Sequence, residues 1–233
     1  QLWQYLEVVN GRALGFYREW HENGNLRLEL NVIEGLGDLN EEAQLSWVYD
    51  GLTRAWDVQG HLLAEIYYEK GKLQGKALYY HQNGKVSKII PYENDRIDGD
   101  ILYYDAKGVL IGKAHYIRGV CHGIATYKGD TKQPAYSEEY YHAALINATY
   151  HDFSRKIIER IENGYGMQPV FEDGNLISKR EYQNGYPEGR VETYDNRGHL
   201  HSVFHVKDGK KHGDVWVYYP SDEKAPQIKL YMQ

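Results

Sequence analysis

Residues 75–86 read Gly75-Lys-Ala-Leu-Tyr-Tyr80-His-Gln-Asn-Gly84-Lys-Val86, and this stretch sets the architecture of the chain. Its Asn-Gly pair lies between two runs of alternating apolar residues, which is the pattern of a tight β-hairpin turn. The leading glycine recurs every 24 residues, at Gly51, Gly75 and Gly99. A fixed period of this length indicates a repeat protein, in which each unit packs mainly on its neighbours.

The period continues through nearly the whole chain. Five residues after the leading glycine comes an aromatic residue, and nine residues after it comes a second glycine, followed by an aliphatic residue such as Leu62. Irregular stretches cover 36–48, which contains an insertion of 12 residues, and 129–163. The nine units start near residues 15, 51, 75, 99, 123, 148, 166, 189 and 213. The aromatic column consists of Trp20, Trp56, Tyr80, Tyr104, Phe153, Phe171, Tyr194 and Tyr218, and Lys128 replaces the aromatic in one unit.

The spacing within each unit predicts two strands of roughly 6–8 residues joined by tight turns. Side chains alternate between the faces of a strand, so Leu28 and Leu30 lie on an apolar face while Arg27 and Glu29 lie on a polar one. The predicted fold is therefore all-β: an extended single-layer antiparallel β-meander of about nine tandem hairpins. Strand twist coils it into a ribbon, and we expect one array over residues 1–233 without separate domains.

Composition limits the classes of function. The net charge is −6 and no run of Lys and Arg reaches four residues, which argues against a nucleic-acid partner. Cys121 is the single cysteine, so neither a disulfide framework nor a cysteine-based metal site is expected within one chain. No apolar stretch approaches the ~18 residues of a transmembrane segment. A cytoplasmic location is favoured, but the first residues resemble the end of a repeat, so a natural start upstream and secretion stay open.

No catalytic, cofactor or metal site is predicted from the motifs. Cys121 and His122 could form a nucleophile and base pair, but neighbours on a strand face opposite ways. His199 and His201 share a strand face, yet no third metal ligand is evident nearby. The enzyme alternative rests only on the degenerate stretch, since residues that break a repeat often mark function.

Two pairs of acidic residues lie in the irregular stretches, Glu41-Glu42 and Glu138-Glu139. We expect a solvated loop or short helix at both, with a recognition loop as the alternative, because insertions in repeat arrays often reach the binding face. After the final strand, Pro220 and Pro226 would protect the sheet edge from association.

The aromatic column has two interpretations that are compatible. The rings stack as a ladder that stabilises the sheet, each cross-strand contact contributing roughly 0.2–1 kcal/mol. Alternatively they line a groove and anchor a partner, since Trp and Tyr are favoured anchors at interfaces. The candidate binding residues are Trp20, Trp56, Tyr80, Tyr104, Phe171, Tyr194 and Tyr218.

The repeat resembles the MORN repeat, in particular its bacterial variant. Residues 75–86, the related stretch 51–62 and the tail Tyr182-Gln-Asn-Gly185-Tyr-Pro-Glu-Gly189 carry the resemblance, which extends over about residues 5 to 220. Many bacterial proteins with this variant are similar to the YwqK-type antitoxin family, and other MORN proteins are protein-binding or membrane-associated scaffolds. The resemblance implies a non-catalytic scaffold with a protein partner, such as a toxin, and supplies no catalytic residues. Fold resemblance by itself does not give function.

Two alternatives to the protein partner remain. A scaffold for lipid head groups is disfavoured by the acidic balance, because anionic leaflets attract basic segments. Choline- or carbohydrate-binding hairpin repeats are also rich in Gly and Tyr and hold quaternary ammonium groups in aromatic cages. Their period is shorter than the one here, and this chain has only five Trp.

Overall fold

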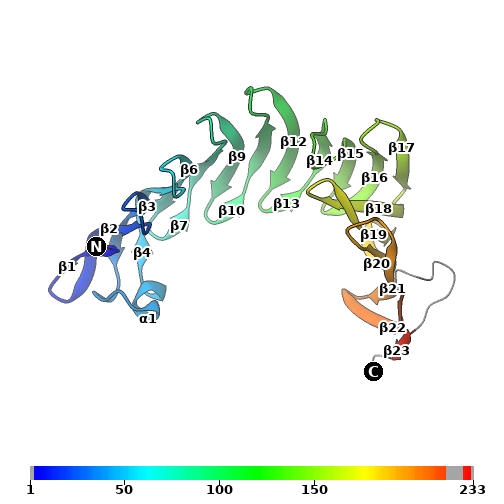
Figure 1. Cartoon of the computed structure of the whole chain (residues 1–233). Helices are drawn as coiled ribbons and strands as arrows, with labels where there is room; N and C mark the ends of the chain where they lie inside the picture. Colours follow the sequence, from blue (N-terminus) through cyan, green and yellow to red (C-terminus); the bar gives the residue numbers. More distant parts are fainter. Residues whose placement is uncertain (1–2, 219–227, 232–233) are drawn as a thin grey trace. The chain divides into compact units, whose positions relative to one another are not determined.

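A computed structural model describes residues 3–218 and 228–231 of the chain. Within these residues the protein is all-β apart from one short helix, and successive strands pair antiparallel in chain order (Figure 1). The predicted antiparallel β-meander of hairpins is therefore confirmed. The chain divides into two compact units, unit 1 (residues 1–120) and unit 2 (residues 121–233). The expectation of one array without separate domains stays a prediction, and Pro220 and Pro226 lie outside the described residues.

Unit 1 repeats one hairpin register. Gly51 pairs with Tyr68 and Trp56 pairs with Leu62, with a β-bulge just before the second pair, and the hairpins that begin at residues 75 and 99 have the same register. Such bulges increase the local twist of the strands. The elements are β1 (Gln4–Val9), β2 (Arg12–Trp20), β3 (Leu26–Glu34), α1 (Glu41–Leu45), β4 (Val48–Tyr49), β5 (Gly51–Trp56), β6 (Leu62–Glu69), β7 (Lys72–Leu73), β8 (Gly75–Tyr80), β9 (Val86–Glu93), β10 (Arg96–Ile97), β11 (Gly99–Tyr104) and β12 (Leu110–Ile117).

The leading glycine of each repeat has a conformational cause. Gly75 has a φ of +73° and Gly99 has a φ of +108°, values that side chains other than glycine rarely adopt. An added Cβ at Gly75 would meet no atom within 4 Å. At Gly75, glycine is therefore required by the backbone conformation at the start of the hairpin rather than by lack of space.

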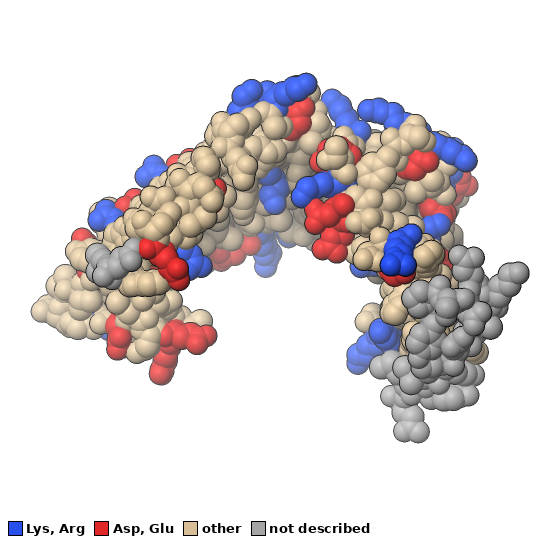
Figure 2. All heavy atoms as spheres, in the orientation of Figure 1, with Lys and Arg blue, Asp and Glu red and all other residues tan. Residues whose placement is uncertain are grey.

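The insertion in the stretch 36–48 forms a short helix on the apolar face of unit 1. Asn40 caps α1, its side-chain oxygen accepting a hydrogen bond from the Ala43 N–H at 2.8 Å. Glu41 and Glu42 occupy the first turn and are exposed, and acidic side chains gather over this part of the chain in Figure 2. The short-helix expectation for this acidic pair is confirmed.

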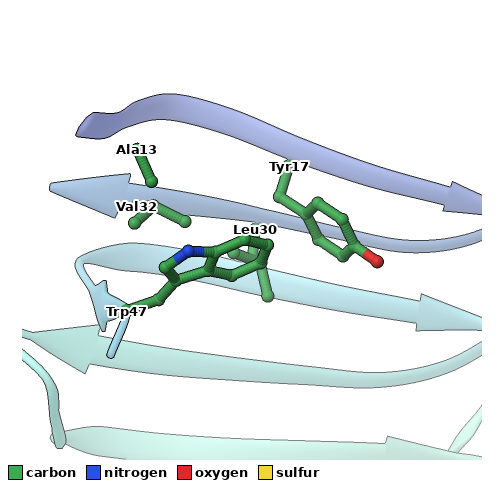
Figure 3. Packing of buried hydrophobic residues seen from close by; sticks show 5 residues of the cluster. All are labelled: Ala13, Tyr17, Leu30, Val32 and Trp47. Atoms are coloured by element: carbon green, nitrogen blue, oxygen red, sulfur yellow. The ribbon is translucent and has the colours of Figure 1, made fainter. Parts of the chain in front are cut away.

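Trp47 holds the insertion against the sheet. Its side chain is 8% exposed, and its ring lies 5.0 Å from that of Tyr17, beside Leu30 and Val32 (Figure 3). Its indole N–H donates a hydrogen bond to the Leu36 carbonyl oxygen at 2.8 Å. The insertion is thus part of the folded core of unit 1.

Unit 2 continues the hairpin pattern through the stretch that the sequence left irregular. Residues 129–163 contain three regular strands. The prediction of a solvated loop or short helix at Glu138-Glu139 is therefore wrong, because both residues lie in a strand and Glu138 is buried. The elements are β13 (Val120–Cys121), which spans the division, and β14 (Gly123–Tyr127), β15 (Tyr136–Tyr141), β16 (Ala144–His151), β17 (Ile157–Glu162), β18 (Tyr165–Glu172), β19 (Asn175–Gln183), β20 (Tyr186–Tyr194), β21 (Leu200–Lys207), β22 (Lys210–Val217) and β23 (Ile228–Tyr231).

The register of β16 and β17 locates the degenerate unit. His151 pairs with Ile157 directly after a bulge, as Trp56 pairs with Leu62 in unit 1. His151 therefore occupies the aromatic column, the unit starts at residue 146 rather than 148, and Phe153 lies in the turn with 48% of its surface exposed.

Candidate functional site

The residues of the aromatic column lie at the end of the first strand of their hairpins. Six members pair across the bulge with the aliphatic residue that the sequence places two residues after the second glycine. Both sequence columns therefore meet at the hairpin end, where they stabilise the bulge region. Tyr218 follows β22, and its N–H donates a hydrogen bond to the His201 carbonyl oxygen at 2.8 Å. The cross-strand pairs are Trp20–Leu26, Trp56–Leu62, Tyr80–Val86, Tyr104–Leu110, Phe171–Leu176 and Tyr194–Leu200.

Two hydroxyls of the column are engaged with carboxylates on the polar face. Tyr80 donates a hydrogen bond to Glu65 at 2.6 Å, and Arg54 contacts the other oxygen of Glu65 at 2.9 Å. Burial and the Glu65 hydrogen bond raise the pKa of Tyr80 to about 12, and the Tyr80 and Arg54 hydrogen bonds lower the pKa of Glu65. In unit 2, Tyr194 donates to Glu192 on its own strand. These hydroxyls already have partners, which favours a structural role for this part of the column.

A second set of aromatic residues lies on the apolar face of unit 1. Because Tyr68 pairs with Gly51 and side chains alternate, it shares a face with Ala64 and Ile66, and the same register places Tyr92 and Tyr116 on that face. We call this surface the tyrosine face. Its members are Tyr49, Tyr68, Tyr79, Tyr92, Tyr103 and Tyr116.

The tyrosine face has a floor of buried aliphatic side chains. Ala77, Ile90 and Ile101 are 2%, 8% and 5% exposed and form one cluster, on which partly buried tyrosines pack. All six tyrosines are half-buried, and the rings of Tyr49 and Tyr68 meet edge to face at 5.4 Å. Burial raises the pKa of Tyr68 and of Tyr92. The phenols of Tyr68 and Tyr92 are therefore protonated at neutral pH.

One cation lies within this surface. Lys88 pairs with Tyr79 on one side and Tyr103 on the other, and its ammonium nitrogen lies 4.6 Å from the centre of the Tyr79 ring. Such a cation–π contact holds the Lys88 stem over the sheet. Among the described residues of unit 1, the helix α1 is the one element that lies on this face outside the strands, and it packs at the β2–β3 end. The tyrosine face is thus a partly exposed aromatic surface, and over the described residues of unit 1 no second layer covers it.

Unit 2 carries a buried carboxylate on the face of its sheet that corresponds to the tyrosine face of unit 1. Glu138 is 9% exposed and accepts hydrogen bonds from Tyr150 at 2.7 Å, Gln168 at 3.1 Å and Tyr140 at 3.0 Å. Burial, followed by the charge of Glu138, raises the pKa of Tyr140 and of Tyr150 above the ordinary range. Three neutral donors satisfy this charge, as buried polar groups require.

Two histidines of the strands and turns each lie beside an aspartate. His115 contacts Asp100 at 2.8 Å in unit 1, and His199 contacts Asp195 at 3.3 Å in unit 2. Across residues 3–218 and 228–231, no three His, Cys, Asp or Glu side chains gather as metal ligands. His122 contacts His142, twenty residues away along the chain.

Comparisons with known proteins indicate the class. The family model described as "MORN repeat variant" matches residues 60–79 and 73–94, which together include β6, β7, β8 and β9. No curated protein matches. One solved structure, "Crystal Structure of TcdB2-TccC3-Cdc42", aligns with 15% identity over 94% of this chain and 12% of that chain, at a TM-score of 0.20. This chain thus spans about 12% of the length of that one.

Together, the hairpin register and the family matches define a hairpin-repeat protein, and the matches support a MORN-repeat protein. MORN repeats suggest a scaffold that binds proteins or membranes, and the family is generally not enzymatic. Within the described residues, no helix has the length and apolar character to cross a membrane.

Proposed function

We propose that this protein is a non-catalytic scaffold that binds a protein partner through the tyrosine face, in the manner of an antitoxin or immunity protein. The tyrosine face carries the proposal: its six tyrosines are half-buried, and four of them pack on a floor of buried aliphatic residues, on a sheet with one layer. Tyrosine combines a large apolar ring with a polar tip, which makes it a favoured anchor at protein interfaces.

The geometry favours a protein over a small ligand. The tyrosines are spread along six strands, β4, β6, β8, β9, β11 and β12. A surface of this kind fits a partner that covers several strands, as interfaces bury about 800 Å² on each side. Anchor residues contribute at least 2 kcal/mol each, so removing one is expected to weaken binding roughly thirtyfold.

Other partners are less well supported. The net charge of −6 disfavours anionic lipid head groups. A choline or carbohydrate site needs a cage of aromatic side chains, whereas the tyrosines here lie on a common face. The aromatic column from Trp20 to Tyr218 remains a candidate anchor set, although the hydroxyls of Tyr80 and Tyr194 are already engaged.

The test is a pull-down from native extract with mass spectrometry, comparing variants of matched chemistry. Tyr92→Ser and Tyr116→Ser alter the tyrosine face, and Tyr67→Ser alters an exposed tyrosine on the opposite face of β6. Trp56→Ser with Tyr104→Ser alters the column. Circular dichroism confirms that each variant folds.

The proposal expects one stoichiometric protein that Tyr92→Ser and Tyr116→Ser lose and Tyr67→Ser retains. A partner lost only with the column variant would move the site to the column. No protein partner, combined with co-sedimentation on anionic liposomes, would overturn the proposal in favour of a lipid scaffold.

A further inference from the structure

Two histidines that are far apart in sequence lie together in unit 2. His122 directly precedes β14, and His142 lies in the turn between β15 and β16. The centres of their rings are 5.3 Å apart and the ring planes are inclined by 54°. The Tyr141 ring lies 4.5 Å from that of His142 and 5.7 Å from that of His122. Tyr141 and His142 are exposed and His122 is half-buried, so solvent reaches this cluster.

The turn that carries His142 has an unfavourable backbone. His142 and Ala143 have φ values of 48° and 68°, whereas the related turn at Asn184 and Gly185 uses residues suited to that conformation. Ala143 is the one alanine with positive φ in the part of the chain that the structure describes. A left-handed conformation costs roughly 1–2 kcal/mol at such a residue, and strain of this kind is retained preferentially at functional sites.

Neighbouring contacts hold the two rings in place. The Ala143 N–H donates to the Cys121 carbonyl oxygen at 3.1 Å, which joins the turn to the segment before His122. The His142 N–H approaches Nδ1 of His122 at 3.5 Å. Nδ1 of His122 therefore faces the turn that carries His142, and because 3.5 Å is too long for a strong hydrogen bond, the lone pair of this nitrogen can bind a metal ion instead.

The ring separation fits two imidazoles on one metal ion. Zinc–nitrogen bonds are about 2.0–2.1 Å long, and a ring centre lies about 1.1 Å beyond its nitrogen, so two rings at a tetrahedral angle have centres about 5.2 Å apart. The separation here is 5.3 Å. Neutral imidazole is a preferred ligand of Zn²⁺ and Cu²⁺.

We propose that His122 and His142 form an open two-imidazole site for a divalent transition-metal ion, Zn²⁺ or Cu²⁺. Since no third His, Cys, Asp or Glu joins them among the described residues, water or an incoming donor completes the coordination. Sequence reasoning expected no metal, because it paired His122 with its neighbour Cys121 and did not bring the turn at residue 142 to it. This site is independent of the tyrosine face, which lies in unit 1.

The experiment titrates the full chain with Zn²⁺ by calorimetry and with Cu²⁺ by electron paramagnetic resonance, which counts coordinated imidazole nitrogens. His122→Ala removes one ligand. His142→Asn removes the other, and asparagine suits the turn, as at Asn184. His199→Ala is the matched control, because that ring is already paired with Asp195. Ala143→Gly relieves the turn and leaves both ligands.

The proposal expects one ion per chain and two nitrogens in the Cu²⁺ spectrum. His122→Ala and His142→Asn should each weaken binding at least tenfold, since loss of even an outer-shell partner costs 10–100-fold. His199→Ala and Ala143→Gly should bind as the unchanged chain does. Unchanged affinity in either ligand variant, or absence of a bound ion in the unchanged chain, would overturn the proposal.

Discussion

The buried carboxylate of Glu138 allows a quantitative test of what holds unit 2 together. Tyr150 is 4% exposed and donates a hydrogen bond of 2.7 Å to Glu138. Hydrogen bonds to charged groups contribute roughly 1.5–3 kcal/mol. In Tyr150→Phe the same carboxylate oxygen keeps its hydrogen bond from Gln168 at 3.1 Å. We therefore expect the free energy of unfolding to fall by about 2 kcal/mol, within the range for such bonds.

The assay is urea denaturation followed by far-ultraviolet circular dichroism. The midpoint gives the change in stability when the slope is unchanged. Tyr186→Phe is the matched control, because Tyr186 is 51% exposed in the same unit. If Tyr150→Phe and Tyr186→Phe unfold at the same urea concentration, the hydrogen bond to Glu138 does not stabilise unit 2. Combining Tyr150→Phe with Glu138→Gln should show non-additive changes, since the two groups are in contact.

The effect should also depend on pH. Burial and the charge of Glu138 raise the pKa of Tyr150 in the folded protein, while the unfolded chain has an ordinary value of about 10. A group with a raised folded pKa stabilises fully below its unfolded pKa, and this stabilisation is lost as pH rises. The difference in the free energy of unfolding between the unchanged chain and Tyr150→Phe should therefore be constant up to about pH 10 and decline above it.

Three further predictions concern unit 1. The Tyr80 phenol, with a pKa of about 12, should titrate above ordinary tyrosines in ultraviolet absorbance, and Tyr80→Phe should remove that step. Gly75→Ala should destabilise the protein by roughly 1–2 kcal/mol in thermal unfolding because φ is +73°, whereas an equal effect of Lys76→Ala would refute a conformational cause. Trp47→Ala should cost roughly 3–5 kcal/mol and alter the near-ultraviolet spectrum, and a loss below about 1 kcal/mol would show that the insertion is not part of the core.

Much of the fold followed from the period, because glycine at a required positive φ and Asn-Gly turns recur at fixed positions. The prediction was wrong where those residues are replaced. In the degenerate unit Arg155 adopts the positive φ that Gly60 has in unit 1, and no glycine marks the turn. Phe153 then suggested the wrong register, since the column position is occupied by His151.

The tyrosine face could have been found in the sequence. Tyr68, Tyr92 and Tyr116 follow the same 24-residue period as the glycines. How the tyrosine face relates to the aromatic column could not be found in the sequence. The bulge beside Trp56 changes the alternation of side chains, and a shift of one residue moves a side chain to the other face of the sheet. The contact between His122 and the turn at 142 likewise depends on the pairing of neighbouring hairpins.

The choice of tyrosine over phenylalanine follows from a sheet with one layer. The chain has 23 Tyr and 4 Phe. On the face of unit 1 the aliphatic floor of Ala77 and Ile90 is buried, but the rings above it stay half-exposed because no second layer covers them. Phenylalanine there would leave a large apolar patch, which soluble monomers rarely expose. A tyrosine ring packs on the floor as a phenylalanine ring would, and its hydroxyl makes the exposed part of the side chain polar, so the same residue stabilises the sheet without adding to such a patch.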